Sequence, residues 1–515
     1  MATHVSAPLL AELANARHSA LPHVIVIGSG FGGLAAAIRF RCKGYRVTVL
    51  EKLSEPGGRA LVFRQDGFTF DAGPTIVTAP FLLDELWALC GRRLSDDIDL
   101  VPMNPFYRIR FADGTHFDYS GDPDAMRREV ARHCPADVPG YEAFMEKAQA
   151  CYRLGFEELG SVAFESLWDL LAAIPNMVRM RAWRSIYAMV CEHFTDPKLR
   201  VVMSFHPLLI GGNPMSVTSA YSLIASLERR YGVHFAMGGT GALIRAMVRL
   251  LEQLGVQVLC GHEVRRIIVE GGRAKGIELK DGRSILSNLV VSNADTAVTY
   301  KHLIDAKHRR HWTDRRIDRG KYSMSLFVWY FGTQCRYEDV PHHMLILGPR
   351  YEALLRDIFH KHHLADDFSL YLHRPTATDP QLAPPGCDSF YVLSPVPHLD
   401  SGTDWVKQAE PYRKAIEAVL ERTVLPGLSQ QVVSSKMITP LYFQQDLNSL
   451  KGAAFGLEPV LLQSAWFRPH NRSEDVKDLY FVGAGTHPGA GIPGVLSSAK
   501  ALDSIIPLAS AWAPA

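Results

Sequence analysis

The sequence lacks several features that would place it in other classes of protein. Its 55 basic and 53 acidic residues leave a net charge of only +2 over 515 residues, which argues against nucleic acid as a partner. Its eight cysteines are scattered without a CxxC pair, so neither a disulfide framework nor a metal site is predicted. It has no internal repeat or low-complexity tract that would indicate a solenoid. With 47% hydrophobic residues, a chain of this length is predicted to form two or three domains with sizeable cores.

Long hydrophobic runs are also scarce. The first twenty residues contain Glu12 and Arg17 and no sustained apolar core, so we expect no secretory signal and favour a reducing compartment. The run Val201 to Leu227 has no acidic or basic residue and raises the question of a membrane span. The sequence Gly-Gly-Asn-Pro at 211–214 divides it, and such a turn would leave backbone groups unsatisfied in lipid. We therefore expect two buried segments around a turn and no transmembrane helix.

A glycine-rich turn near the N-terminus follows an apolar strand predicted over His23 to Ile27. Gly28, Gly30 and Gly33 form GxGxxG, and a helix-like run and a second strand lead to Glu51. Glycine allows close approach of the backbone to a ligand, and the start of the helix presents free N–H groups to phosphate. An acidic residue about 20 positions past the turn hydrogen-bonds the ribose in dinucleotide folds. The segment therefore predicts a dinucleotide site.

A second glycine-rich segment lies near the C-terminus. It reads GAGTHPGAGIPGVLSSAK over 483–500, directly after an apolar strand run and before a helix-like tail. Two such turns at opposite ends of the chain indicate one ligand held by both. The turn after Glu51 contains Gly57, Gly58 and Arg59, and a guanidinium there could contact a pyrophosphate; the alternative is an exposed loop arginine.

The middle of the chain has a different pattern. From about Asp84 to Leu227 we expect helices, and the stretch Phe164 to Val190 is rich in Leu, Trp, Met and Tyr and is interrupted by Pro175. Three arginines follow Pro175, at 179, 181 and 184. Apolar aromatics beside arginines suit a helix lying in a membrane interface, whereas the alternative is a core helix with a solvated edge. A second basic cluster, at 307–321, is interpreted as a solvated helix face.

Strand-like runs dominate the rest of the chain. A meander of strands is predicted over 256–292, and we expect this block to belong to the cofactor-binding domain. Further strands are expected over 324–331, 369–372 and 390–393, which would form the sheet of a second domain.

These motifs together resemble the flavin-dependent amine-oxidase-like superfamily, and within it the bacterial phytoene desaturases of the carotenoid desaturase family. The resemblance covers nearly the whole chain. The motifs that carry it are GSGFGGL from Gly28, EKLSEPGGRA from Glu51, FDAGPT from Phe70, LLIGGNP from Leu208, GVHFAMGGTGAL from Gly232, SMSLFVWYFG from Ser323, SLYLHRPTATDP from Ser369, GLEPVLLQSAWFRPHNR from Gly456 and GAGTHPGAGIPG from Gly483. The first two mark the superfamily, and the last two are the most specific.

The resemblance implies an α/β fold with a Rossmann-like FAD-binding domain built from discontinuous segments. A mixed-sheet substrate domain and a helical membrane-associated region would complete it. The expected boundaries are 1–85, 230–300 and 472–515 for the FAD-binding domain, 86–229 for the helical region and 301–471 for the substrate domain.

The resemblance also implies FAD as cofactor, with the N-terminal unit holding its ADP half and the C-terminal loop lying along its isoalloxazine ring. The residues expected to bind FAD are Gly28, Gly30, Gly33, Glu51, Lys52, Gly58, Arg59, Val264, Gly483, Gly485, Gly491, Ile492 and Pro493. The expected substrates are phytoene and partly desaturated carotenes, taken from a membrane surface by a peripheral protein on its cytoplasmic side. Oxygen or a quinone would reoxidise the flavin.

The chemistry expected from this resemblance is hydride transfer from an allylic C–H to flavin N5, with loss of a proton from the neighbouring carbon. His487 and His206 are the candidate bases. A hydrocarbon offers nothing polar to hold, so an apolar tunnel is expected, with candidates Leu208 to Ile210, Phe235, Met237, Phe327, Trp329, Phe455, Trp466 and Phe467. Two alternatives on the same fold are a redox-neutral carotene cis-trans isomerase and a non-enzymatic prenyl-lipid binding protein.

Overall fold

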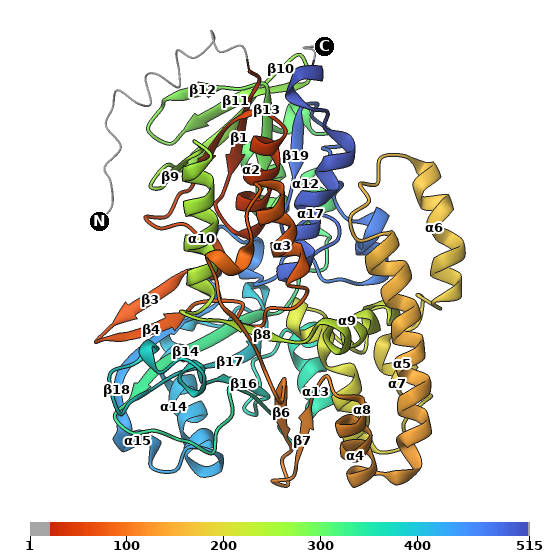
Figure 1. The fold of residues 1–515 in the computed structure, drawn as a ribbon, viewed down its shortest axis with the longest axis vertical. Helices are drawn as coiled ribbons and strands as arrows, with labels where there is room; N and C mark the ends of the chain where they lie inside the picture. Colours follow the sequence, from red (N-terminus) through yellow and green to blue (C-terminus); the bar gives the residue numbers. More distant parts are fainter. Residues whose placement is uncertain (1–20, 513–515) are drawn as a thin grey trace.

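The computed structural model describes residues 21–512, so the expectation for the first twenty residues lies outside the described part of the chain. The described chain forms two lobes, one above the other in Figure 1, and each is built on its own β-sheet. In the upper lobe, strand β1 and helix α17, from opposite ends of the chain, lie within one layered unit (Figure 1). The α/β class expected from the sequence is confirmed.

The upper lobe contains a five-stranded parallel sheet in the order β19–β13–β1–β2–β9. These strands are β1 His23–Ile27, β2 Arg46–Leu50, β9 Gln257–Leu259, β13 Leu289–Ser292 and β19 Leu479–Phe481. Every residue of β1 is buried because both faces of the sheet are covered. Val24 and Val26 pack against helices, and Ile25 and Ile27 pack on the opposite face, as the strand period of two requires.

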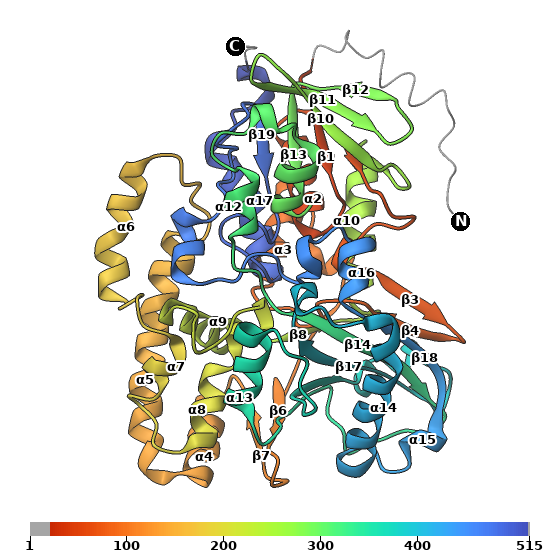
Figure 2. The ribbon, with the colours of Figure 1, turned by 180° about the vertical axis from the view of Figure 1, so that it is seen from behind.

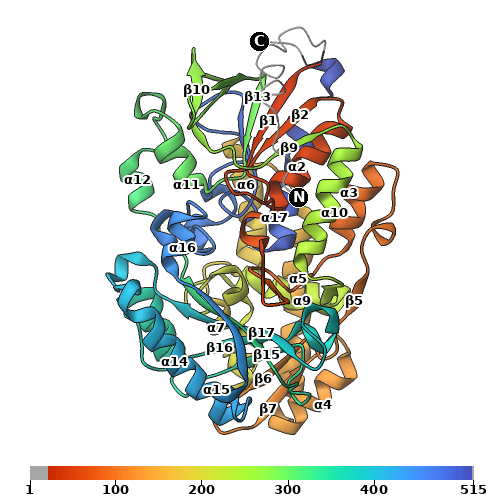
Figure 3. The ribbon, with the colours of Figure 1, turned by 90° about the vertical axis from the view of Figure 1, so that its left-hand side faces the viewer.

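The layers on the two faces of this sheet differ in kind (Figure 3). One face packs on the helices α2 Phe31–Cys42, α10 Thr240–Gln253 and α17 Ile492–Ile505. The other packs on an antiparallel three-stranded sheet of β10 Val264–Glu270, β11 Arg273–Leu279 and β12 Ser284–Leu286. The meander predicted over 256–292 therefore belongs to two sheets, because its first and last strands join β1 and β2 while its middle strands cover them.

The lower lobe contains a seven-stranded mixed sheet in the order β18–β14–β17–β16–β15–β6–β7, in which only the β15–β6 pair is parallel. The strands are β6 Tyr107–Arg110, β7 His116–Tyr119, β14 Ser325–Thr333, β15 His343–Ile346, β16 Leu370–His373, β17 Asp388–Val396 and β18 Val432–Ile438. Phe327 and Trp329 of β14 pack against helix α14 Trp405–Thr423. The alternate residues Leu326 and Val328 point to the opposite face, toward the upper lobe.

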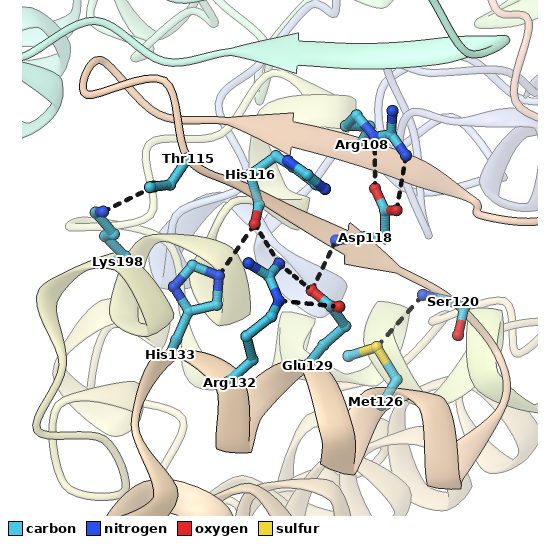
Figure 4. Close-up of polar contacts among 10 residues, drawn as sticks. All are labelled: Arg108, Thr115, His116, Asp118, Ser120, Met126, Glu129, Arg132, His133 and Lys198. Atoms are coloured by element: carbon cyan, nitrogen blue, oxygen red, sulfur yellow. Dashed lines mark hydrogen bonds and ion pairs between the residues drawn. The ribbon is translucent and has the colours of Figure 1, made fainter. Parts of the chain in front are cut away.

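The expectation that 86–229 is helical needs a correction, because this segment also contains the strands β5 Leu100–Pro102, β6 and β7. The β6–β7 hairpin is held from below by helix α4 Pro123–His133 (Figure 4). Arg132 and His133 both bond the backbone oxygen of His116, and Met126 Sδ accepts the N–H of Ser120. The alternation of buried Tyr107 and Ile109 with arginines was the signal for a strand in this stretch.

The helical part of this segment comprises α3 Phe81–Leu89, α4, α5 Val138–Tyr152, α6 Leu167–Arg179, α7 Ile186–Val190, α8 Pro197–Ser204 and α9 Leu223–Tyr231. Helix α6 lies at the edge of the molecule in Figures 1 and 2, and it continues through Pro175. The run 201–227 folds as short helical pieces around Gly211, which is left-handed at φ 79°. Within residues 21–512, no helix is long and apolar enough to cross a bilayer.

Shorter elements complete the two lobes. They are β3 Val62–Gln65, β4 Phe68–Asp71, β8 His234–Ala236, α11 Thr296–Val298, α12 Asp314–Asp318, α13 Tyr351–Arg356, α15 Leu428–Gln431 and α16 Pro440–Gln445. The β3–β4 and β5–β8 pairs are two-stranded and antiparallel.

A buried ion pair stabilises the lower sheet at the start of β17. Asp388 is fully buried and accepts hydrogen bonds from Arg374 Nε at 2.9 Å and from Thr376 Oγ1 at 2.7 Å. The guanidinium of Arg374 is itself buried, so it depends on this carboxylate for charge compensation.

We predict that Asp388→Ala lowers the free energy of unfolding by about 3–5 kcal/mol, because it leaves Arg374 charged, buried and unpaired. The control Asp281→Ala removes the partner of Arg283 in a half-exposed pair and should cost less than about 1 kcal/mol. Chemical denaturation followed by circular dichroism measures both. Equal losses in the two variants would contradict this assignment.

Candidate functional site

A cavity of about 570 Å³ lies between the two lobes. Its upper walls come from the turns at the carboxyl ends of the parallel strands β1, β2, β13 and β19, which is the usual place for a ligand in an open parallel sheet. Its lower wall contains Leu326 and Val328 of β14 and Leu393 of β17. The cavity therefore joins a backbone-rich half to an apolar half.

The N-terminal turn leaves room for a ligand at the start of α2. Gly28 adopts φ 91°, a conformation that favours glycine, and a Cβ on Gly33 would lie 2.0 Å from the oxygen of Gly28. Helix α2 has no side-chain cap at Gly30, so its first N–H groups remain available. Gly28 and Gly30 line the cavity, whereas Gly33 allows helix and turn to pack together.

Glu51 lies at the end of β2 and lines the cavity. Its Oε2 accepts the N–H and the hydroxyl of Ser29 at 2.9 and 2.8 Å, and its Oε1 accepts the N–H of Leu53 at 3.0 Å. These bonds fix the carboxylate at the mouth of the N-terminal turn. The neighbouring Lys52 also lines the cavity, and its Nζ donates to Asn448 Oδ1 at 2.9 Å.

Arg59 extends toward the cavity from the turn after β2. One of its terminal nitrogens donates to Ser449 Oγ at 2.9 Å, while its Nε is buried without a partner. Burial lowers the pKa of Arg59, and the nearby Asp295 opposes this shift. A buried guanidinium with an unused donor fits an anionic group such as a pyrophosphate.

The C-terminal loop closes the cavity from the other end of the chain. Gly483 has φ 92°, and a Cβ there would lie 2.5 Å from Asn293 Oδ1. Gly491 has φ 94° and precedes α17, whose N-terminus carries no side-chain cap. Ile492 and Pro493 at the start of this helix line the cavity. Free N–H groups at this helix start suit an electron-rich ring edge.

The cavity brings together most of the residues predicted to bind FAD. Those lining it are Gly28, Gly30, Glu51, Lys52, Gly58, Arg59, Val264, Gly483, Gly491, Ile492 and Pro493. Gly33 and Gly485 lie outside it, and a Cβ on Gly485 would meet Thr296 Oγ1 at 2.2 Å, so its glycine serves packing. The residues present thus fit a flavin dinucleotide.

The two candidate bases occupy different positions. His487 lines the cavity, and its Nε2 lies 2.8 Å from the oxygen of Leu159, which leaves Nδ1 buried without a partner. Burial lowers the pKa of His487 to about 4. The hydrogen bond to Leu159 opposes this decrease in pKa, and the charges of Arg468 and His470 add to it. His206 does not line the cavity, and its Nε2 lies 3.2 Å from Oε2 of the cavity-lining Glu228.

The predicted tunnel lining was partly wrong. Leu208 to Ile210, Phe455, Trp466 and Phe467 line the cavity, but Phe235, Met237, Phe327 and Trp329 do not. Phe327 and Trp329 belong to the face of β14 that packs on α14, and Phe235 lies in the core with its ring 4.6 Å from that of His342. The strand period was right for β14, but the period alone does not say which face meets the cavity.

Sequence reasoning missed several residues of the site. Asn293 follows β13 and lies among the glycines of both turns, within 3.0 Å of the Cβ positions of Gly30, Gly32 and Gly483. Its position directly after a buried parallel strand was the available signal. Thr75 was overlooked as well, and its hydroxyl is the hub of a cluster in the lower wall, 3.1 Å from Tyr371 Oη and 2.8 Å from Tyr391 Oη.

Comparison with known sequences identifies the family and the relatives of the chain. The family model described as flavin containing amine oxidoreductase matches residues 31–501. The chain is 48% identical over 488 residues to a neurosporene-forming phytoene desaturase of Cereibacter sphaeroides, covering 94% of each chain. It is 46% identical over 477 residues to a lycopene-forming phytoene desaturase of Pantoea ananas, covering 92% of this chain and 97% of the relative.

Comparison with solved structures supports the fold. A putrescine oxidase bound to putrescine matches with a TM-score of 0.64 at 13% identity, covering 94% of this chain and 99% of the other. An oxidoreductase from Methanosarcina mazei matches with a TM-score of 0.61 at 18% identity, covering 94% of this chain and all of the other. At these identities the likeness shows the fold alone, a flavin amine-oxidase-like α/β architecture.

We predict that Arg59→Leu weakens FAD binding roughly tenfold or more, because it removes the buried guanidinium that faces the cavity. The control Arg64→Leu changes an exposed arginine on the neighbouring strand β3 and should leave affinity unchanged. Titration of the apoprotein with FAD, followed by flavin fluorescence, gives both dissociation constants. An unchanged affinity in Arg59→Leu would remove this residue from the site.

Proposed function

The chain belongs to the flavin-containing amine oxidoreductase family and, within it, to the bacterial phytoene desaturases, and we propose on that premise that it desaturates phytoene with FAD as oxidant. The observation that carries the proposal is the cavity, which places an apolar chamber directly against the flavin-binding turns. The relatives named above form neurosporene or lycopene. Carotenoid biosynthesis is therefore the role we assign, with successive desaturation of partly desaturated carotenes.

The apolar half of the cavity suits a substrate without polar groups. Leu326, Val328 and Leu393 present aliphatic side chains to it, and a polyene can be held there only by shape and by exclusion of water. Correct placement of one C–H bond against the flavin then supplies much of the rate enhancement.

FAD, when bound, supplies the acceptor for the hydride. Loss of a hydride from an allylic carbon makes the neighbouring C–H strongly acidic, so even a weak base can remove the proton. We propose His487 as this base, because its Nδ1 has no protein partner and the residue lies in the loop beside the start of α17. His206 does not line the cavity, so in this proposal it influences the site only by its contact with Glu228, which does line it.

Desaturation, isomerisation and lipid binding differ in product mass. We predict that the FAD-loaded protein in phytoene-containing liposomes, with oxygen or a quinone as acceptor, yields products lighter by two hydrogens per step. Chromatography with mass detection identifies each product and counts the steps. Products of unchanged mass but altered geometry would favour the isomerase, and phytoene recovered unaltered would favour the lipid binder.

We predict that His487→Gln slows flavin reduction by phytoene about 100-fold or more, whereas His206→Gln has a much smaller effect. In the wild type, flavin reduction should stay constant at neutral pH and fall as the pH drops through about 4, where protonation of His487 removes its lone pair. Single-turnover absorbance at each pH measures this. A fall already centred near the ordinary histidine value, or an equal loss in both variants, would contradict the assignment.

We further propose that α6 attaches the protein to a membrane surface. Trp168 is 77% exposed and Val178 54% exposed on one side of the helix, while Ala173 and Met177 on the other side line the cavity. A helix of 13 residues spans about 20 Å, too short to cross the apolar core of a bilayer but long enough to lie along its interface. Its two apolar faces would connect lipid with the chamber that accepts a lipid-dissolved substrate.

The arginines at the end of α6 and just after it contribute unequally to this surface. Arg179 and Arg181 are exposed, although Arg181 Nη1 lies 4.0 Å from Glu192 Oε2, whereas Arg184 is half-buried and pairs closely with Glu192. Exposed cations beside apolar side chains favour anionic lipid. Arg179 and Arg181 are therefore the residues that we assign to contacts with lipid headgroups.

We predict that Trp168→Ser combined with Val178→Ser reduces flotation with liposomes roughly tenfold or more, because it removes the exposed apolar side chains of α6. The matched control, Val406→Ser with Leu508→Ser, changes exposed apolar residues on other elements and should float like the wild type. Neutralising Arg179 and Arg181 should weaken binding to anionic but not to neutral vesicles. Flotation unaffected by all α6 changes would exclude this helix as the attachment site.

A further inference from the structure

Three histidines meet at the ends of two neighbouring strands of the lower sheet. His343 begins β15 and His373 ends β16, and the two are direct partners in the antiparallel register. His342 precedes β15, and its ring lies 4.9 Å from that of His373. All three are less than 8% exposed, and each offers a ring nitrogen within 4.8 Å of the others.

The hydrogen bonds of the cluster direct one nitrogen of each of two rings outward. His342 Nδ1 bonds Thr378 Oγ1 at 2.6 Å, and His343 Nδ1 bonds Tyr371 Oη at 2.7 Å. The Nε2 atoms of both rings are thereby left for the centre of the cluster. This is the arrangement in which metal-binding histidines are usually fixed, with the second ring nitrogen held by a neighbouring polar group.

Hydrogen bonding does not satisfy the centre of the cluster. His342 Nε2 and His373 Nε2 lie 3.0 Å apart, where a single hydrogen can bridge them. His343 Nε2 and His373 Nδ1 are buried without any partner. Buried polar atoms without partners are uncommon and call for an explanation, such as an ion.

The rings are also in the charge state that a metal requires. Burial lowers the pKa of His342 to about 3, with the charge of Arg374 adding to the shift. Burial, together with the mutual repulsion of the rings, holds the pKa of His343 and of His373 well below the ordinary value. All three are neutral at physiological pH and present lone pairs, which is the ligating form of imidazole.

We propose that His342, His343 and His373 form a binding site for a divalent transition metal of the Zn²⁺ class. Three imidazoles favour zinc and its first-row neighbours over magnesium or calcium, which take oxygen ligands. Tetrahedral coordination at about 2.0–2.1 Å separates ligand nitrogens by roughly 3.3 Å, so the cluster needs only small side-chain rotations to close around an ion. It is the one group of this kind found among residues 21–512.

The position of the site suggests what the ion would do. Tyr371 contacts His343 and also lines the cavity, where it bonds Thr75. An ion bound by the three histidines would lie one layer behind the cavity wall. It would link β15 to β16 and fix the orientation of Tyr371, which is part of that wall. Its role would therefore be to stabilise that wall.

The test uses the FAD-loaded full chain without an affinity tag, stripped with a chelator, dialysed and then supplied with Zn²⁺. Elemental analysis should find about one zinc per chain, and the unfolding temperature should rise with free Zn²⁺. His343→Gln and His373→Gln should each bind at least tenfold less. The control His398→Gln changes a buried histidine whose ring lies 4.6 Å from that of His362, and it should bind like the wild type.

Co²⁺ provides a measurement that does not depend on the variants folding. Replacing Zn²⁺ by Co²⁺ in the wild type should produce the visible absorption bands of a tetrahedral nitrogen site, and Zn²⁺ should displace them. A folded wild type that binds no Zn²⁺ and gives no Co²⁺ bands would overturn the proposal. Equal binding by the wild type and His373→Gln would overturn it too.

Discussion

The close approach of backbone segments around Asn293 is the constraint on which the site depends. Glycines from the first turn and from the C-terminal loop surround this side chain, and a Cβ on Gly32 would lie 2.7 Å from its Oδ1 and 2.9 Å from the N of Gly483. No larger residue fits at these positions without moving the main chain. The two glycine-rich segments are therefore fixed against the end of β13, and the cavity opens where they meet.

The lower lobe contributes the side chains that line the other half of the cavity. Strand β14 alternates, with Phe327 and Trp329 against α14 and Leu326 and Val328 toward the cavity. The half of the cavity beside the glycine-rich turns is thus made largely of main chain, and the half beside β14 largely of apolar side chains. This division explains how a polar dinucleotide and a hydrocarbon can share one chamber.

The parts of this structure that were predictable from sequence are those encoded locally. Strand β1 was placed at its observed bounds because an apolar run ends at a glycine turn, and α2 and β2 followed from the same unit. The hairpin β6–β7 was missed because its partner β15 lies more than 230 residues away, and short strands amid helices give a weak signal. The meeting of His343 with His373 depends on strand register, which no local pattern reveals. For β14 the pattern gave the strand but not its cavity-facing residues.

The alternation of β14 has a consequence for protein engineering. Its cavity-facing residues can be enlarged or trimmed singly, each at a different position along the chamber, while the residues between them keep the sheet anchored to α14. Substitutions at these positions would therefore change the depth to which a polyene can enter the cavity. Chain-length preference could in this way be altered without touching the glycine-rich turns on the opposite side of the cavity.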